Sequence, residues 1–356
     1  MMRPLNEQSV VITGASSGIG RRTAIEFGRR GAMLTLAARN EEALNETAEE
    51  VRAAGGRAHV VVTDVAEWDQ VERLAQQAAE HWERIDTWVN NAGVTVYSLF
   101  ETLSVAEIDR VIRVNLLGQI YGAKAALPHL RHAGGGTLIN VSSEVGVRGV
   151  PLQSVYCAAK HGIKGFTEAL RMELEHEGAN IQVTLIVPSG INTPFFEHAR
   201  SKMGVKPKPP GAVYEPEVVA DAIVFAAENP RREIFVGAPA KSYDLLQRVS
   251  PRLVDRMMLA GGHAFEDQMT DSPDSGFDNV FETQGGKGSS RGVFPGRASS
   301  WYTRTFEHHP ALKAVAAGVA AGSVAALALG LGSRLGGKAD RRRFDPRGSL
   351  RRTLGR

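Results

Sequence analysis

The sequence predicts a three-layer α/β/α fold in which helices cover both faces of a doubly wound, seven-stranded parallel sheet. Up to about residue 237, short runs rich in β-branched residues alternate with longer helical patterns, and this alternation is typical of parallel strands joined by crossover helices. The chain has 356 residues, of which 43% are hydrophobic and 23% charged. It is therefore long enough to bury a large core, and a wholly disordered or fibrous protein is excluded.

Seven short apolar runs are the expected strands. In chain order they are Val10–Thr13, Met33–Ala37, Ala58–Val62, Thr87–Asn90, Gly136–Val141, Ile181–Val187 and Glu233–Val236. Helices are expected between successive strands, among them Asn40–Ala54, Glu67–Glu83, Ser104–Leu130 and Ser154–Glu177. A doubly wound sheet binds ligands at the carboxyl ends of its strands, so we expect the functional residues directly after the strands.

Composition divides the chain into a body (1–240), an extension (241–310), an apolar Ala/Gly-rich segment (311–332) and a basic tail (333–356). Within the extension, Gly261–Ser300 is rich in Gly, Ser, Asp and Asn, which predicts a poorly ordered or loosely packed stretch. The apolar segment is long enough to span a bilayer as a helix, but its Ala and Gly content makes insertion marginal. Three alternatives stay open: it spans a membrane, lies on one, or avoids it.

The distribution of charge and the number of cysteines limit which partners and which cellular compartment we expect. Residues 333–356 carry nine basic and two acidic side chains, whereas the whole chain has a net charge of only +3. The body is therefore mildly acidic, which argues against nucleic acid as a partner and leaves the basic tail free to meet a phospholipid surface. Cys157 is the only cysteine, and no secretory signal precedes the first strand, so we expect a cytoplasmic protein with membrane association through the C-terminal segment left open.

Histidines offer no metal-ligand spacing. They stand singly at positions that give no cluster with other ligand types, namely His59, His81, His129, His132, His161 and His176. Surface or capping roles explain such residues, and no metal site is expected.

A glycine-rich turn follows the first expected strand, where Thr13–Gly20 reads TGASSGIG. Gly14, Gly18 and Gly20 fit positions where a Cβ would block a tight turn or the close approach of a phosphate, and the helix that begins near Gly18 points its free amides at an anion. This pattern predicts a dinucleotide site.

Arg39 ends the second expected strand, where an acidic residue would bind a free ribose 2′-hydroxyl. Its guanidinium suits a 2′-phosphate instead, which predicts NADP(H) in preference to NAD(H). Arg21 and Arg22 follow the glycine-rich turn, and either lie near a phosphate or are solvated.

Tyr156 and Lys160 stand four residues apart on one expected helix, and hence on one face. An ammonium at about 4 Å would lower the pKa of a tyrosine from its usual value of about 10 toward neutrality. This pair therefore predicts a general acid and base. Ser142 and Ser143 end the fifth strand a short distance upstream.

These motifs together resemble the short-chain dehydrogenase/reductase family in its short single-domain form, with a Rossmann fold, over roughly residues 5–240. The resemblance implies four catalytic residues: Asn115, Ser143, Tyr156 and Lys160. Tyr156 would exchange a proton with the carbonyl or alcohol oxygen, Ser143 would donate a hydrogen bond to that oxygen, and Asn115 would hold a water that links Lys160 to solvent. Ser142 would be structural.

The glycine-rich turn, Arg39 and the resemblance together imply the residues of the cofactor site. They are Gly14, Ser16, Ser17, Gly18, Ile19, Gly20, Arg39, Asp64, Val65, Asn91, Ala92, Gly93, Tyr156, Lys160, Pro188, Gly190 and Thr193. Asp64 and Val65 correspond to the adenine contact, and Thr193 to the carboxamide contact. Ser189 lies between Pro188 and Gly190, where the family has Pro-Gly, and this leaves the backbone path before Thr193 open.

The expected activity is NADP(H)-dependent interconversion of a carbonyl and an alcohol by hydride transfer. A catalytically idle dinucleotide-binding scaffold or sensor, held at a membrane by its tail, is the alternative, and the complete set of four catalytic residues argues against it. The long segment Ser189–Val213 carries Phe195, Phe196 and Met203, which indicate either an apolar substrate or the hydrophobic anchor of a lid. The resemblance also implies a homodimer or homotetramer.

Overall fold

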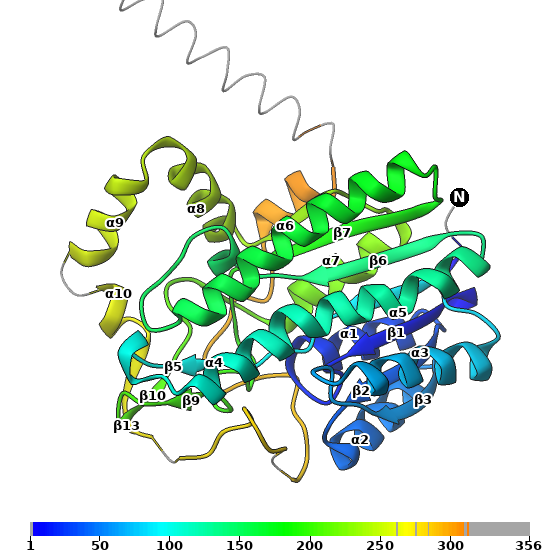
Figure 1. Ribbon diagram of the computed structural model, residues 1–356, viewed down its shortest axis with the longest axis horizontal. Helices are drawn as coiled ribbons and strands as arrows, with labels where there is room; N and C mark the ends of the chain where they lie inside the picture. Colours follow the sequence, from blue (N-terminus) through cyan, green and yellow to red (C-terminus); the bar gives the residue numbers. More distant parts are fainter. Residues whose placement is uncertain (1–2, 261–262, 275, 284, 310–311, 313–356) are drawn as a thin grey trace, which may run out of the picture. The chain divides into compact units, whose positions relative to one another are not determined.

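Seven parallel strands form the central sheet of this computed structural model, which describes residues 3–260, 263–274, 276–283, 285–309 and 312. The strand order is β12-β7-β6-β4-β1-β2-β3, as expected for a doubly wound fold (Figure 1). The strands are β1 Ser9–Thr13, β2 Met33–Ala38, β3 Arg57–Val62, β4 Thr87–Asn90, β6 Gly136–Val141, β7 Ile181–Pro188 and β12 Glu233–Val236. The predicted fold class is confirmed, and every predicted strand boundary lies within one residue of the observed one.

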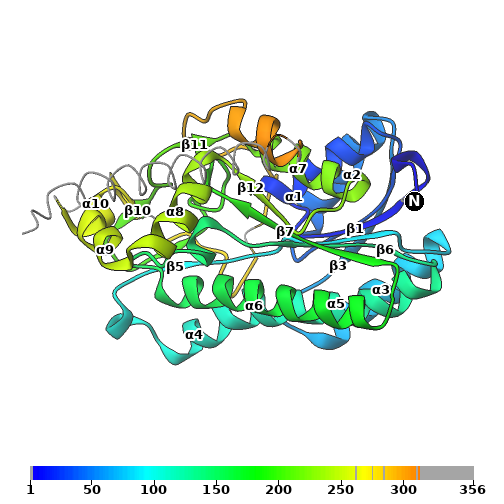
Figure 2. The same cartoon turned by 90° about the horizontal axis from the view of Figure 1, so that it is seen from above.

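Helices pack on both faces of this sheet (Figure 2). One face carries α1 (Gly18–Gly28), α2 (Glu41–Ala53) and α7 (Pro216–Glu228), and the other carries α3 (Trp68–Trp82), α5 (Gly118–His132) and α6 (Ser154–His176). Each face has its own apolar cluster, because the buried strands present side chains to both sides. The strand order reverses between β1 and β4, so the carboxyl ends of these two strands frame the crevice where such sheets bind ligands.

The helix predicted over Ser104–Leu130 is observed, as one continuous helical run from Val105 to His132. It consists of α4 (Val105–Ile112), a π-turn (Arg113–Leu117) and α5. Two close contacts lie at the π-turn: the Asn115 side chain bonds to the backbone of Val94, and a Cβ on Gly118 would lie only 2.8 Å from the Val65 side chain. π-turns of this kind occur frequently at functional sites.

Short strands and helices surround the carboxyl end of the central sheet. Three two-stranded pairs form between β5 (Val96–Tyr97) and β9 (Arg200–Ser201), β8 (Gly190–Ile191) and β11 (Val213–Tyr214), and β10 (Val205–Pro207) and β13 (Met269–Pro273). Helices α8 (Ala238–Val249), α9 (Pro251–Leu259) and α10 (His263–Glu266) precede β13.

Much of the stretch Gly261–Ser300, expected to be poorly ordered or loosely packed, is irregular and exposed in its described residues. It is nevertheless attached to the body, since β13 pairs with β10, Val280 is completely buried, and the chain then returns along the body toward α2 (Figure 1). Several of these attachments are backbone hydrogen bonds, which a glycine-rich, polar composition permits.

Contacts group the described residues up to His308 into one compact unit, to which residues 309–356 do not belong. Apart from Leu312, the apolar segment 311–332 and the tail 333–356 lie outside the described residues, so the expectations for them stay predictions, as does the division at residue 240. Within the described part of the chain, no helix combines the length and apolar character needed to cross a membrane.

Candidate active site

A cavity of about 310 Å³ lies at the carboxyl ends of the central strands. All the residues expected to contact the cofactor line it except Gly20, which lies behind the turn, and Ser143 lines it as well. Asn115 is completely buried and does not reach the cavity. Apart from Gly20 and Asn115, the structure thus brings the predicted site residues together around one cavity.

The glycine-rich turn between β1 and α1 is held in a conformation that requires glycine. Gly14 has a φ of +69°, and a Cβ on Gly20 would lie 2.1 Å from the backbone oxygen of Gly14. The side chain of Asn91 donates to the backbone oxygen of Thr13 at 3.0 Å. The turn is therefore fastened to the end of β4, and Gly18 and Ile19 at the start of α1 line the cavity.

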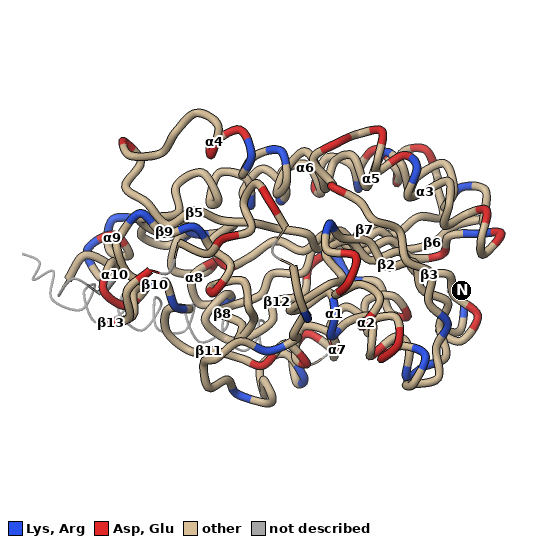
Figure 3. The backbone as a smooth tube through the Cα atoms, turned by 90° about the horizontal axis from the view of Figure 1, so that it is seen from below, with Lys and Arg blue, Asp and Glu red and all other residues tan. Residues whose placement is uncertain are grey.

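The side chains of Arg21 and Arg22 are held by carboxylates, so neither the expected phosphate contact nor full solvation describes them. Arg21 is 5% exposed and donates to Glu50 at 2.9 and 3.1 Å, and Arg22 pairs with Glu26. Both guanidinium groups join α1 to neighbouring carboxylates instead of facing a phosphate or bulk solvent. The acidic positions along α2, shown red in Figure 3, were the signal that sequence reasoning missed.

Two guanidinium groups mark the opposite end of the cavity. Arg39 donates to the backbone oxygens of Asn279 and Phe281, the latter at 3.0 Å, and Arg110 donates to Asp64 at 2.7 Å. Burial lowers the pKa of Arg39, and the charge of Arg110 lowers it further, so these two cations reinforce a positive potential there. Sequence analysis missed Arg110, because it stands on α4 outside any motif.

Tyr156, Ser143 and Lys160 meet at the junction of α6 and β6. Ser143 follows β6 and is hydrogen-bonded to Tyr156 through its side chain. Lys160, one turn after Tyr156, is 2% exposed, and its Nζ lies 5.5 Å from the centre of the Tyr156 ring. The Oγ of Ser142 donates to the backbone oxygen of Lys160 at 3.1 Å, which is a structural contact.

The pKa of Tyr156 is raised, not lowered as the sequence analysis expected. Burial is the main cause, and the hydrogen bond with Ser143 acts in the opposite direction. Burial also lowers the pKa of Lys160 to about 7, so its charge is only partly present at neutral pH. The predicted proximity of the two groups is observed, whereas the predicted electrostatic effect of the amine on the phenol is not.

Asn115 holds neighbouring backbone segments in place. Its Nδ2 donates to the backbone oxygens of Val94 and Val111, both at 2.8 Å, and its Oδ1 accepts from the Val94 amide. Both side-chain donors are therefore committed to protein. A water held by this residue would have to bind an atom other than those donors.

Aromatic side chains form the wall beyond Tyr156. Phe195 and Phe196 line the cavity, and the ring of Phe195 lies 5.6 Å from that of Tyr156. Both rings belong to an apolar cluster with Tyr97 and Leu152. The segment 189–213 is thus both cavity wall and packed anchor, and its short strands β9 and β10 fasten it to its surroundings.

Glu144 and Cys157 are buried titratable groups beside this site. Burial raises the pKa of Glu144 to about 8 and also raises that of the Cys157 thiol, which favours the neutral forms of both. Within the ranges that the structure describes, no group of three or more His, Cys, Asp or Glu side chains is arranged to hold a metal ion.

Comparison with known families agrees with this arrangement. The family model described as short chain dehydrogenase matches residues 8–204. The chain belongs to this family of oxidoreductases.

Individual relatives make the comparison more specific. The chain is 40% identical over 329 residues to "Uncharacterized oxidoreductase YxnA" of Bacillus subtilis, covering 91% of this chain and 92% of that protein. It is 33% identical to "Ketoacyl reductase HetN" of Nostoc sp., covering 72% and 90%. A crystal structure of a short-chain dehydrogenase/reductase from Burkholderia phymatum in complex with NAD is similar with a TM-score of 0.65 and 27% identity, covering 71% of this chain and 97% of that one.

Proposed function

We propose that this protein is an NADP(H)-dependent reductase or dehydrogenase that interconverts a carbonyl and an alcohol, with Tyr156 as general acid and base. The observation that carries the proposal is the meeting of Tyr156, Ser143 and Lys160 at a cavity whose far end is a glycine cradle. The idle scaffold receives no support, because the residues needed for proton transfer accompany the cradle in one space.

The residues present fit a dinucleotide. Gly14 and Gly18 both have positive φ, and a Cβ on Gly18 would lie 3.2 Å from the Thr193 side chain, so only glycine leaves the cradle open. The backbone amides at the start of α1 would hold the pyrophosphate, and Asp64 and Val65 would flank the adenine. The nicotinamide supplies or accepts the hydride when bound.

The preference for NADP(H) rests on Arg39 and Arg110. The carbonyl groups of Asn279 and Phe281 accept hydrogen bonds from Arg39 but do not neutralise its charge. A 2′-phosphate would bring negative charge to a place where Asp64 pairs with Arg110 and the nearby Asp278 pairs with Arg200, while Arg39 donates to backbone carbonyl groups. An uncharged ribose hydroxyl would gain much less binding free energy from these guanidinium groups.

The raised pKa of Tyr156 suits proton donation during carbonyl reduction. The phenol stays protonated at neutral pH, so its Oη can give a proton to the carbonyl oxygen while Ser143 donates a hydrogen bond to the same atom. Lys160, with a pKa of about 7, is able to return a proton to the phenolate. Asn115 would hold a water in this relay. Alcohol oxidation runs the same transfers in reverse.

The aromatic wall supports an apolar carbonyl substrate. Phe195 and Phe196 face the cavity beside Tyr156, and one relative carries the name ketoacyl reductase. An acyl chain with a keto group is the substrate class that joins these two observations. We expect a homodimer or homotetramer, as the family resemblance implies.

NADPH oxidation with a panel of ketones, aldehydes, steroids and ketoacyl thioesters tests this function. Tyr156→Phe is expected to lower kcat by at least about 10²-fold, because only the proton donor is lost, while NADPH binding followed by its fluorescence persists. Tyr121→Phe, on α5 next to Trp68 and outside the cavity lining, is the matched control and should retain activity. Full turnover by Tyr156→Phe contradicts the proposed role.

A further inference from the structure

A segment of the C-terminal extension runs across the mouth of the cavity. It comprises residues 277–283 and 285–292, and we call it the strap. Its cavity-lining residues are Phe277, Asn279, Thr283, Gly285, Gly286, Lys287 and Gly288. The cavity therefore has an inner wall formed by the sheet and the glycine-rich turn, and an outer wall formed by the strap.

The first part of the strap is fastened near Arg39 and Arg110. Asp278 forms an ion pair with Arg200 at 2.7 Å, and Arg110 donates to the backbone oxygen of Val280 at 2.8 Å. The side chain of Val280 is completely buried, in an apolar cluster that also includes Tyr156. This end of the strap is therefore packed as firmly as core residues are.

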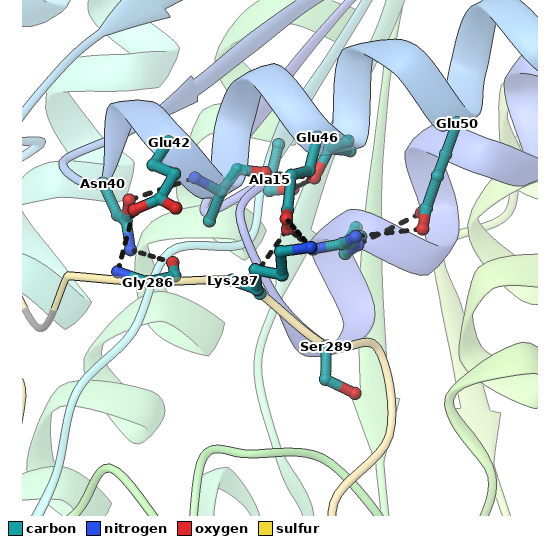
Figure 4. Close-up of polar contacts among 12 residues, drawn as sticks. Ala15, Asn40, Glu42, Glu46, Glu50, Gly286, Lys287 and Ser289 are labelled. Carbon is teal, nitrogen blue, oxygen red and sulfur yellow. Dashed lines mark hydrogen bonds and ion pairs between the residues drawn. The ribbon is translucent and has the colours of Figure 1, made fainter.

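The second part lies along α2 (Figure 4). The backbone amides of Gly286 and Gly288 donate to the carboxylates of Glu42 and Glu46, each at 3.1 Å. Asn40 donates to the backbone oxygen of Gly286 at 3.2 Å. Backbone amides on carboxylates are charge-assisted hydrogen bonds and among the stronger ones in proteins.

The last part reaches the start of α1 and the end of β8. The amide of Gly18 donates to the backbone oxygen of Ser289 at 2.8 Å, and that of Gly292 donates to Asn192 at 3.3 Å. A Cβ on Gly288 would lie 2.1 Å from the Ser16 oxygen, and one on Gly292 would lie 2.7 Å from the Thr193 oxygen. No other residue type fits so close to the body at these two positions.

We propose that the strap is part of the cofactor site: the bound dinucleotide lies between strap and sheet, and it leaves only when the strap opens. The strap bridges both rims of the cavity, from Arg39 at one end to Gly18 and Asn192 at the other. Beyond the buried Val280, its attachments are mostly backbone hydrogen bonds, so residues 285–292 can open while Val280 stays in the apolar interior. The inference rests on the proposed function, since it assigns the cavity to a dinucleotide.

The alternative is that the strap and the cofactor compete for the same binding groups. Ser289 accepts one of the free amides of α1, and Asn279 and Phe281 accept from Arg39, so a strap that had to leave before NADPH bound would weaken binding. The two readings differ in kinetics. Loosening an enclosing strap speeds cofactor exit, whereas loosening a competing strap speeds entry and tightens binding.

Stopped-flow fluorescence of the full-length protein distinguishes them. Protein loaded with NADPH is mixed with excess NADP⁺, and the exit rate is compared between the unmodified chain, Gly288→Ala and Asp278→Ala. Gly165→Ala is the matched glycine-to-alanine control, because this residue lies on the exposed side of α6 outside the cavity lining, and a Cβ there meets no atom within 4 Å. We expect exit to accelerate about tenfold in both strap variants, corresponding to about 1.4 kcal/mol of lost anchoring, and to stay unchanged in the control.

Hydrogen exchange of the strap peptides supplies a second readout. NADPH should slow exchange at the strap amides of the unmodified chain if the strap closes over the cofactor, and faster exchange would overturn the proposal. Unchanged exit rates in both variants, or tighter NADPH binding with faster entry, would overturn it as well. Thermal unfolding checks that each variant is folded. If the unmodified chain binds no NADPH at all, the proposed function itself fails, which separates the two results.

Discussion

The side-chain amine of Lys160 donates a hydrogen bond to the backbone oxygen of Val141 across 2.9 Å. Val141 is the last residue of β6 and Lys160 lies in the second turn of α6, so this contact joins the helix that carries Tyr156 to the strand that leads into Ser143. Burial lowers the pKa of Lys160 to about 7. The same residue thus holds the helix that carries Tyr156, the proposed proton donor, and can itself gain or lose a proton at neutral pH.

Glu144→Gln is expected to remove a pH dependence of stability. The pKa of Glu144 is raised from 4.5 to about 8, so the folded state keeps this proton to a higher pH than the unfolded state does. The stabilising contribution is complete below pH 4.5 and is lost as pH rises through 8.

Relative to Glu144→Gln, the unmodified chain should lose about 1.4 kcal/mol of unfolding free energy per pH unit across this window. Urea unfolding at pH 5 and pH 8 measures the difference. Glu49→Gln, on the exposed side of α2, is the control. Equal pH dependence in the unmodified chain and Glu144→Gln would show that the carboxyl ionises freely when folded.

Arg39→Asp is expected to reverse the cofactor preference. A charge-assisted hydrogen bond to a phosphate contributes about 1.5–3 kcal/mol, so the ratio of kcat/KM for NADPH over NADH should fall at least about tenfold. Arg39 also holds the strap, and Gly288→Ala separates the two effects because it should change both cofactors alike. A ratio unmoved by Arg39→Asp would contradict the assignment of the 2′-phosphate to this residue.

Gly20→Ala tests the packing of the glycine cradle. Its Cβ would lie 2.1 Å from the backbone oxygen of Gly14, so α1 must shift away from the turn. We expect a loss of about 1–3 kcal/mol in unfolding free energy together with weaker NADPH binding. Gly165→Ala is the matched control: it lies on the exposed side of α6, where a Cβ meets no atom within 4 Å, and alanine should stabilise that helix slightly. Equal stability of the two variants would contradict this packing argument.

The sheet and the glycine-rich turn could be predicted because their signals are local. Alternating apolar runs specify strands regardless of what surrounds them, and Gly14 and Gly20 follow from the geometry of one turn. The helix predicted over Ser104–Leu130 is observed, whereas its π-turn could not be predicted, since Asn115 and Gly118 make their contacts there with residues distant in sequence.

The remaining differences arise from long-range contacts and burial. Arg110 reaches the cavity through its pairing with Asp64, which lies 46 residues earlier, and the strap returns to α2 from more than 240 positions away. The direction of the pKa shift of Tyr156 depends on how deeply phenol and amine are buried. An i, i+4 spacing indicates that two side chains are neighbours, but it carries no information on their solvation.

The glycines of the strap affect which positions of this chain are expected to tolerate substitution. Substitutions in a polar, glycine-rich spacer are ordinarily harmless, yet at Gly288 and Gly292 a single added methyl group would collide with backbone of the body. A saturation scan should therefore find intolerant positions in a stretch that composition alone would label dispensable. Trimming the chain to the length of its family-model match would likewise remove the strap, together with α7 and β12 of the central sheet.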